Sequence, residues 1–338
     1  MIDGITIQVE IKEFLKWRLR MPFEIHTSIN TDDGTIKTTK KKDNSVNDKF
    51  VEFDYQTIKH TAKYQTYELV ITEVNKVNRM PKYYLKIKGS LHKNKFNGAN
   101  FKRFYHLDVI NEINKLCDVL EIDSKIAKID GLEFGVNIQT DFVPYSFLSE
   151  HLIRYKHLQF NQYAPDRLNR RLGYECVLSQ YSVKIYDKGL QFNLPYNLMR
   201  FELKYKTMQK VNSIGIYTLH DLTKSDELDS LKDILLLAWN NVLLYEPLET
   251  GNAILTKSQK ELIVNGNNIK YWNNLHKSNK TKYNYHRDVF KELIRDYGKE
   301  YHSKLLAKIG KEWQYLSNPV FDEFIIKIKD KLVESVTA

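Results

Sequence analysis

Residues Val183–Lys188 read VKIYDK, and residues Leu198–Lys204 read LMRFELK. Both stretches alternate apolar and polar side chains with a period of two residues, which predicts two β-strands that each bury one face. If the strands pair as a hairpin, Tyr186, Glu202 and several cations lie together on the polar face. A tyrosine, a carboxylate and cations are groups that phosphodiester chemistry uses.

Tyr186 is the candidate nucleophile of this polar face. A phenol has a reference pKa near ~10, so it attacks poorly at neutral pH unless a metal ion or cations favour the phenolate. Glu202 would hold the metal ion, and Lys188, two residues along the same predicted strand, would face the same phosphate. The alternative is structural: Tyr186 is then an aromatic side chain in a half-buried sheet beside a solvated lysine.

The composition indicates a globular protein. Its positive charge fits a nucleic-acid partner, although a composition rich in Lys and Asn also follows from an AT-rich genome. The chain has 338 residues, of which 42% are hydrophobic and 28% charged, enough for one large domain or two of ordinary size. No apolar run approaches the ~20 residues of a membrane span, and the N-terminus lacks the pattern of a secretion signal. The formal net charge of +10 suits binding to a phosphate backbone.

The two cysteines, Cys117 and Cys176, are far apart in the sequence and form no C-x-x-C motif. We expect them to be reduced core thiols of a cytoplasmic protein. Zinc sites of the finger or ribbon type are excluded, because these sites need closely spaced cysteines and histidines.

The pattern along the chain predicts an α+β fold. A mainly antiparallel sheet flanked by helices is expected over residues 1–222, and an all-helical region over residues 223–338. Before the hairpin, strands are predicted at residues 1–11, 50–58, 67–74, 83–88 and 131–138, helices at 106–121 and 146–156, and a poorly patterned connection at 161–180. After it, helices are predicted at residues 225–245, 254–264, 280–297, 300–316 and 318–335.

Two stretches of the chain are rich in basic residues. Residues 270–312 contain eleven Lys or Arg against five Asp or Glu, with tyrosines interleaved. Basic helices of this kind bind duplex DNA, although a solvated helix face has the same composition. Residues 28–49, which include Lys40–Lys42, are expected to form a solvated loop or an arm that faces DNA.

Six segments of the chain carry a resemblance to a known family. They are Met1–Asp3, Ile87–Lys93, Leu132–Ile138, Lys184–Gly189, Leu198–Lys204 and Gly215–Leu222. In order and spacing they resemble the gene II replication initiators of filamentous phages and, more closely, related replication proteins of phages and mobile elements in the Bacteroidetes. The resemblance covers about the first two thirds of the chain.

The resemblance implies a rolling-circle replication initiator. Such a protein nicks one origin strand, keeps the 5′ phosphate on a tyrosine, leaves a 3′ hydroxyl for the polymerase and later rejoins the displaced strand. The expected partners are origin DNA, both duplex and single-stranded, and host replication proteins such as a helicase and a polymerase. We expect it to act in the cytoplasm of a bacterial host, without membrane association.

The resemblance also assigns roles to individual residues. Tyr186 matches the nucleophilic tyrosine, and Lys188 matches the lysine two positions after it. Glu202 matches the carboxylate of the R-F-E motif, and Glu133 matches a carboxylate in the middle strand. A site built of carboxylates favours Mg²⁺ or Mn²⁺ over zinc. Asp130 is an alternative to Glu133, which we prefer because its strand alternation continues unbroken.

The remaining candidate residues are three cations, a histidine and a second tyrosine. Arg200, Lys204 and Lys184 are expected to contact DNA. Many rolling-circle initiators bind metal with a His-hydrophobic-His pair, which this chain lacks, so His92 is the nearest candidate for a histidine ligand. Tyr181 is a second candidate nucleophile, on the opposite face of its strand by parity.

Other functions are compatible with parts of the pattern. A non-catalytic origin-binding protein or repressor would need only the basic helices, but it would have no need of the tyrosine and carboxylates together. A tyrosine recombinase is a second alternative, because His151 and Arg154 form an H-x-x-R motif, yet Tyr186 lies in a predicted strand rather than a helix. A capsid or other structural role explains neither the charge nor the paired strands.

Overall fold

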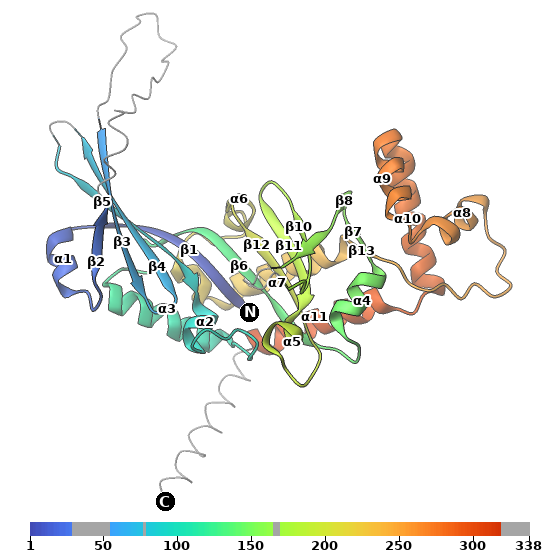
Figure 1. Ribbon diagram of the computed structural model, residues 1–338, viewed down its shortest axis with the longest axis horizontal. Helices are drawn as coiled ribbons and strands as arrows, with labels where there is room; N and C mark the ends of the chain where they lie inside the picture. Colours follow the sequence, from blue (N-terminus) through green and yellow to red (C-terminus); the bar gives the residue numbers. More distant parts are fainter. Residues whose placement is uncertain (29–54, 77–78, 165–169, 319–338) are drawn as a thin grey trace, which may run out of the picture.

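The computed structural model describes residues 1–28, 55–76, 79–164 and 170–318. A ten-stranded sheet runs through an elongated molecule, and the predicted α+β fold class is confirmed (Figure 1). Its strand order is β2-β3-β4-β5-β1-β6-β12-β11-β10-β9, with antiparallel neighbours throughout the described part. The strands are β1 (Ile2–Ile11), β2 (Ile25–Ser28), β3 (Tyr55–Tyr64), β4 (Tyr67–Lys76), β5 (Lys82–Ser90), β6 (Lys128–Gln139), β9 (Asn161–Tyr163), β10 (Gly173–Val177), β11 (Tyr181–Asp187) and β12 (Leu198–Tyr205).

Strands β11 and β12 form the hairpin that the sequence predicts. Lys184 lies opposite Glu202, and Tyr186 lies opposite Arg200. On its other side β12 pairs with β6, which in turn pairs with β1. Because side chains alternate between the faces of a strand, the polar side chains of these central strands gather on one face.

Helices cover the opposite face of the sheet. Trp239 of α7 (Ser225–Asn240) packs edge-on against Phe201, with ring centroids 5.1 Å apart. Trp313 of α11 (Tyr301–Ser317) packs in the same way against Phe134 at 5.9 Å. Helix α3 (His106–Leu120) joins the same hydrophobic core. Since Phe201 and Glu202 are consecutive in one strand, burying the phenylalanine under α7 turns the glutamate to the polar face.

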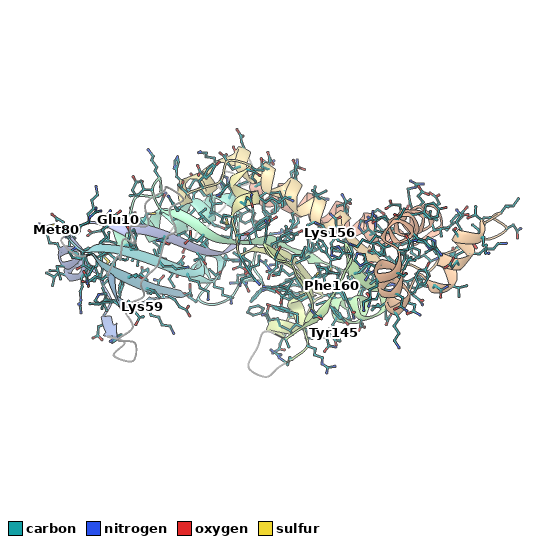
Figure 2. All side chains as sticks on the ribbon, turned by 90° about the horizontal axis from the view of Figure 1, so that it is seen from above. Glu10, Lys59, Met80, Tyr145, Lys156 and Phe160 are labelled. Carbon is teal, nitrogen blue, oxygen red and sulfur yellow. The ribbon has the colours of Figure 1, made fainter. Side chains whose placement is uncertain are left out.

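A second, smaller hydrophobic core lies at one end of the molecule, around helices α8 (Lys257–Asn265), α9 (Ile269–Ser278) and α10 (Lys280–Tyr297) (Figure 1). Its residues include Trp272 and Phe290, which pack with Ile153 and Leu243 of a three-stranded sheet. That sheet contains β7 (Leu152–Tyr155), β8 (Leu158–Gln159) and β13 (Val242–Leu244). Viewed from above, Met80 marks the far end of the elongated molecule (Figure 2).

The two cores divide the helices differently from the sequence pattern. Helices α7 and α11 pack in the core of the large sheet, whereas α8, α9 and α10 form the separate one. The boundary predicted at residue 222 therefore separates a sheet from helices that cover it. We expect residues 1–222 to form the catalytic strand-transfer domain and residues 223–338 a basic, helical DNA-binding or accessory domain, and this division of functions stays a prediction.

Several local predictions need correction. The helix predicted at residues 146–156 ends early: α4 spans Pro144–His151, and the fully buried Leu152–Tyr155 pairs with β13 instead. The connection predicted at 161–180 contains β9 and β10, and α9 was not predicted. The helix at 318–335 and Lys40–Lys42 lie outside the described residues.

Lys188 does not continue strand β11 as predicted. It is the first residue of the short helix α5 (Lys188–Phe192), because the Asp187 side chain accepts a hydrogen bond from the Leu190 amide at 2.7 Å and caps that helix. The other short helices are α1 (Phe14–Arg20), α2 (Leu91–Lys95), α6 (Gln209–Asn212) and a 3₁₀ turn at Leu219–Thr223. None of the described helices has the length and apolar character needed to cross a bilayer.

Candidate active site

Three carboxylates from three adjacent strands meet on the polar face of the sheet. Asp3 comes from β1, Glu133 from β6 and Glu202 from β12, and one oxygen of each lies within 4.8 Å of the others. Asp3 and Glu202 are buried, with 2% and 1% of their surface exposed, and Glu133 is half-buried. Buried carboxylates this close need cations to stay ionised.

Protein cations supply that charge. Arg200 forms ion pairs with both Asp3, at 2.9 Å, and Glu202. Lys184 Nζ lies 2.9 Å from Glu202 and 3.8 Å from Glu133. Burial alone would raise the carboxylate pKa values, but the cations prevail: the pKa of Asp3 falls to about 2, chiefly through Arg200, and that of Glu202 lies well below its ordinary range. Both carboxylates are therefore ionised at neutral pH.

Glu133 behaves differently from the other two carboxylates. Burial and the nearby Glu202 charge raise its pKa, against the opposing effect of Lys184. Its closest cation is Lys204 at 3.2 Å, whose side chain is 45% exposed and whose charge is screened by water. Glu133 is thus the member of the cluster with the least protein compensation.

Hydrogen bonds from neutral groups fix Asp3 in place. Asn100 donates to Asp3 Oδ2 at 2.6 Å, and the Ser90 hydroxyl donates to Oδ1. Arg200 also donates to Asn137 Oδ1 at 3.0 Å, so one guanidinium connects strands β1, β6 and β12. Five N–H donors in a rigid plane make arginine suited to this bridging.

The Tyr186 phenol lies between the acidic cluster and Lys188. Its hydroxyl donates to Glu202 Oε2 at 3.4 Å and accepts from Lys188 Nζ at 3.3 Å. Burial, reinforced by the Glu202 charge, raises the pKa of Tyr186 well above 10. In this environment the phenol keeps its proton unless a base or a cation acts on it.

Lys188 is almost completely buried at the start of α5, with 1% of its surface exposed. Burial and the neighbouring Arg200 charge lower its pKa to about 7, against the opposing attraction of Glu202. A lysine with this pKa is present partly as the neutral amine at physiological pH. It can then accept a proton from a neighbouring phenol.

A cavity of about 400 Å³ opens onto these groups. Its walls include Asp3, Glu133, Glu202, Tyr186 and Lys188 together with Tyr163, Lys184 and Lys204. The ring of Tyr163 lies 5.0 Å from that of Tyr186, and Lys184 Nζ lies 5.2 Å from the Tyr163 centroid. A phosphodiester that entered this cavity would meet the tyrosine, the carboxylates and the cations at once.

The structure brings together most of the predicted site residues. Tyr186, Lys188, Glu133, Glu202, Lys184, Arg200 and Lys204 all lie in one network. Asp130, the alternative to Glu133, is exposed and outside the acidic cluster. Of the two alternatives, Glu133 is the one that lies in the cluster, and its role as a metal ligand stays a prediction.

His92 does not join the acidic cluster. Its ring is buried and stacks on Phe104 with centroids 4.8 Å apart. Both ring nitrogens lack a hydrogen-bond partner in the described part of the chain, and burial holds the pKa of His92 well below its ordinary value. His92 is therefore a neutral imidazole beside the site.

Two other candidate groups lie apart from Tyr186. The Tyr181 hydroxyl shares a hydrogen bond of 2.9 Å with Tyr155 on the buried face. His151 Nδ1 is paired with the Tyr245 carbonyl oxygen, and Arg154 donates to Asn273. Neither residue of the H-x-x-R motif therefore contacts Tyr186.

Sequence reasoning missed two members of the site. Asp3 is the third carboxylate of the cluster. The pairing of its strand with β6 shifts register between Ile2 and Ile5, so strand parity did not predict that Asp3 faces Glu202. Tyr163 comes from β9, a three-residue strand too short to show a period. Asp3 lies in a segment that carries the family resemblance, and this was the available signal.

The oxygen donors of the cluster fit a divalent cation such as Mg²⁺ or Mn²⁺. Carboxylate oxygens are the ligands that these hard cations prefer. Burial, and after it the charge of Glu202, raises the pKa of Glu133, and a bound cation would favour the ionised form of this carboxyl. Arg200, Lys184 and Lys204 already balance the three carboxylates, so a metal ion would compete with these cations.

Comparisons with known proteins add little to this geometry. A scan against protein-family models finds no match, and a search among curated proteins finds no similar sequence. Among solved structures, the chain is similar to the rolling circle replication initiator protein from Geobacillus stearothermophilus, with a TM-score of 0.35 and 12% sequence identity. The match covers 75% of this chain and 88% of that chain. Likeness at this level assigns neither a fold family nor a mechanism.

Proposed function

We propose that the protein is a metal-dependent, tyrosine-linked DNA strand transferase that initiates rolling-circle replication. The observation that carries this proposal is the position of the Tyr186 hydroxyl, 3.3 Å from Lys188 and 3.4 Å from Glu202 of a three-carboxylate cluster, in one open cavity. A nucleophile, a base and a cation site are the parts that phosphodiester transfer needs. A protein that only binds DNA needs none of them.

Lys188 is the base that activates Tyr186. Glu202 also contacts the phenol, but its pKa is lowered by Lys184 and Arg200, which makes it a poor proton acceptor. The neutral amine of Lys188, whose pKa is about 7, takes the phenol proton as the tyrosine oxygen attacks phosphorus. The new bond is between Tyr186 and phosphorus, the bond that breaks is between phosphorus and the 3′ oxygen, and that oxygen takes a proton from solvent.

The carboxylates Asp3, Glu133 and Glu202 would hold the divalent cation. When bound, such an ion polarises a phosphate oxygen and stabilises the charge that develops there. Lys184 and the partly exposed Lys204 add positive charge to the same wall of the cavity. Arg200 is buried by its carboxylate partners and positions them rather than contacting DNA.

The phosphotyrosine bond makes the reaction reversible. It conserves the free energy of the broken phosphodiester, so rejoining needs no ATP. A 3′ hydroxyl attacks phosphorus and loses its proton to solvent, and the bond between phosphorus and the Tyr186 oxygen breaks as the DNA strand is regenerated. Lys188, protonated in the first step, returns its proton to the tyrosine oxygen as this leaves. One site therefore serves both nicking and rejoining.

Helix α9 supplies a candidate surface for duplex DNA. A three-residue turn, Gly266–Asn268, joins α8 to α9, and the Asn268 side chain caps α9. Lys270, Asn274 and Lys277 of α9 are all exposed and are spaced four and three residues apart, which places them on one face. Short turns of this kind join the two helices of helix-turn-helix motifs, whose second helix contacts DNA.

Cleavage of DNA from the protein's own replicon tests the proposal. Supercoiled and single-stranded circles are incubated with Mg²⁺ or Mn²⁺, and the products are resolved on a denaturing gel, with mass spectrometry of peptide–DNA adducts. We expect a nick with DNA attached to the Tyr186 peptide, lost in Tyr186→Phe and in chelator but retained in Tyr181→Phe. Tight duplex binding without any cleavage would favour the origin-binding alternative, in which the cations alone balance the carboxylates.

A further inference from the structure

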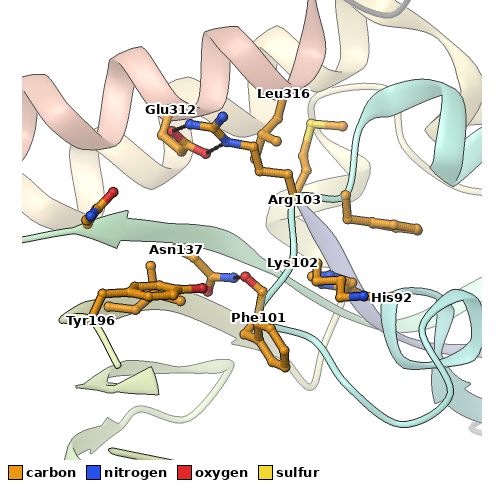
Figure 3. Close-up of a pocket in the computed structure, with 12 residues that line it drawn as sticks. His92, Phe101, Lys102, Arg103, Asn137, Tyr196, Glu312 and Leu316 are labelled. Carbon is orange, nitrogen blue, oxygen red and sulfur yellow. Dashed lines mark hydrogen bonds and ion pairs between the residues drawn. The ribbon is translucent and has the colours of Figure 1, made fainter. Parts of the chain in front are cut away.

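A second cavity, of about 300 Å³, lies beside the candidate active site (Figure 3). Part of its wall continues the polar face of the sheet, because Asn137 and Leu198 share strand parity with Glu133 and Glu202. Another part comes from Glu312 and Leu316 of α11. From Glu202 to Leu198 the strand advances four residues, about 13 Å at 3.3 Å per residue. Arg200 connects the two cavities, since it contacts Glu202 in the first and Asn137 in the second.

Aromatic rings form two sides of this second cavity. Figure 3 shows Tyr196 and Phe101 next to each other, flanking Asn137. Tyr196 is 43% exposed, and Phe101 is half-buried and supported by Phe192, with ring centroids 5.0 Å apart. Exposed aromatic rings beside a basic groove are what proteins use to stack unpaired bases.

Polar groups in the same cavity match the remaining parts of a nucleotide. Lys102 is exposed at its rim and forms no ion pair within the described part of the chain, so its charge is available to a phosphate. Gln139 presents an exposed amide. His92 lies at the buried side of the cavity, and its ring nitrogens have no hydrogen-bond partner in the described part of the chain.

We propose that this second cavity receives an unpaired base of the DNA strand that is cut at Tyr186. Tyr196 and Phe101 would stack on the base, and Lys102 would contact the adjoining phosphate. A volume of about 300 Å³ lies at the small end of ligand pockets, which suits one base and excludes a duplex. The inference rests on the proposed function, because it makes the second cavity a subsite for the same strand.

The test uses oligonucleotides that span the cleavage site mapped with the wild type, each lacking one base. Binding is measured in the Tyr186→Phe background. We expect one abasic position to weaken binding by about 5- to 150-fold, the range of a single stacked base. With Tyr196→Ala added, the intact oligonucleotide should bind as weakly as that abasic one, whereas Tyr196→Phe should restore the difference.

Tyr217→Ala is the matched control, because Tyr217 is also exposed but lies outside both cavities. Thermal melting of each variant shows that it is folded. The proposal is overturned if no abasic position weakens binding, or if the same position still weakens it in Tyr196→Ala. Either result leaves nicking by Tyr186 intact. Free deoxynucleoside monophosphate is titrated in parallel. If the protein binds it tightly, Tyr196→Ala removes this binding and no abasic position matters, then the ligand of the cavity is a free nucleotide.

If the wild type cuts no DNA, the proposed function has failed and the cavity is tested separately. Oligothymidylate binding is then compared between Tyr196→Ala and Tyr217→Ala. A loss confined to Tyr196→Ala supports a base pocket in a non-catalytic DNA-binding protein. Equal binding by the two variants rejects the pocket as well.

Discussion

The amine nitrogen of Lys188 lies 3.3 Å from the phenol oxygen of Tyr186, although Lys188 begins helix α5 and Tyr186 belongs to strand β11. The contact depends on the turn at Asp187, whose side chain caps the helix and directs Lys188 back over the tyrosine ring. If strand β11 continued through Lys188, the lysine side chain would leave the strand on the same face as Tyr186, two residues further along the chain. In the capped turn the Lys188 amine lies against the Tyr186 hydroxyl, which makes the two an acid–base pair.

The rate of nicking should rise with pH and level off above about 7. Below the pKa of Lys188 the neutral fraction of its amine falls tenfold for each pH unit, and with it the fraction of protein able to accept the Tyr186 proton. Single-turnover nicking between pH 5 and 9 measures this. Lys188→Arg should remove this rise of the rate with pH and slow nicking by about 10²-fold or more. Lys204→Arg should keep the wild-type dependence of the rate on pH. A wild-type rate independent of pH would contradict the role.

Lys188→Met should stabilise the protein while slowing nicking by about 10²-fold or more. The folded-state pKa of about 7 lies below the unfolded value of 10.5, so the unfolded state binds more protons between these values. The resulting penalty is fully present below pH 7 and disappears as pH rises through 10.5. At pH 7 the variant should gain at most about 5 kcal/mol of unfolding free energy. Urea denaturation should show a smaller gain in unfolding free energy at pH 10 than at pH 7. An equal gain at the two pH values would mean that the buried charge of Lys188 is not its cause.

Glu202→Gln and Glu133→Gln should differ in stability. Glu202 is the shared partner of the buried Arg200 and Lys184, so its loss leaves buried cations undercompensated and should cost about 3–5 kcal/mol. Glu133 pairs mainly with the half-exposed Lys204, so its replacement should change stability by about 1 kcal/mol or less. Urea denaturation of both variants in chelator checks this, and similar losses would mean that the network is not centred on Glu202.

Mn²⁺ should raise the melting temperature of the wild type but not of Glu133→Gln. Binding to the folded state alone adds about 2.7 kcal/mol when the ion is at a hundred times its Kd. Glu133 is the carboxylate with the weakest protein compensation, so it is the one most in need of the ion. Glu68→Gln is the control, because Glu68 is exposed beside Lys88 and outside the cluster. Equal shifts in all three proteins would place the metal ion elsewhere.

The sequence predicted those parts of the site that depend on strand parity. Tyr186, Glu202 and Glu133 lie in strands of seven residues or more, where alternation with buried neighbours decides the face. Parity could not show that Arg200 would bridge Asp3, Glu202 and Asn137, because that depends on which strands are neighbours across the sheet. Sheet order is a tertiary property. His92 was likewise beyond reach, since only packing against Phe104 shows that it lies outside the cluster.

Elements at the ends of helices and in short strands were predicted least well. Leu152–Tyr155 is apolar enough to extend the preceding helix, and only its pairing with Val242–Leu244 makes it a strand. Helix α9 begins at the Asn268 cap after a short polar turn that resembles a loop in the sequence. In both cases the local pattern is ambiguous and the tertiary partner decides.

Lys270→Ala combined with Lys277→Ala should weaken duplex binding without changing cleavage of a single strand. Both lysines are exposed on one face of α9. This helix lies at the end of the molecule, away from strands β1, β6 and β12, which carry the carboxylate cluster (Figure 1). Each lysine that contacts a phosphate contributes about 0.9 to the slope of log K against log salt. The double variant should therefore reduce that slope by about 1.8, measured by titrating duplex DNA at several salt concentrations.

Lys115→Ala combined with Lys125→Ala is the matched control for α9, because it removes the same charge from exposed positions on and after helix α3. We expect this control to bind duplex with the wild-type salt slope. If the two double variants lose affinity equally, the effect comes from net charge and α9 makes no specific contact. The other outcome is a loss of affinity in the α9 variant alone, with its single-strand nicking rate unchanged. In that case duplex recognition belongs to the small core, strand cleavage belongs to the core of the large sheet, and the two functions are separable.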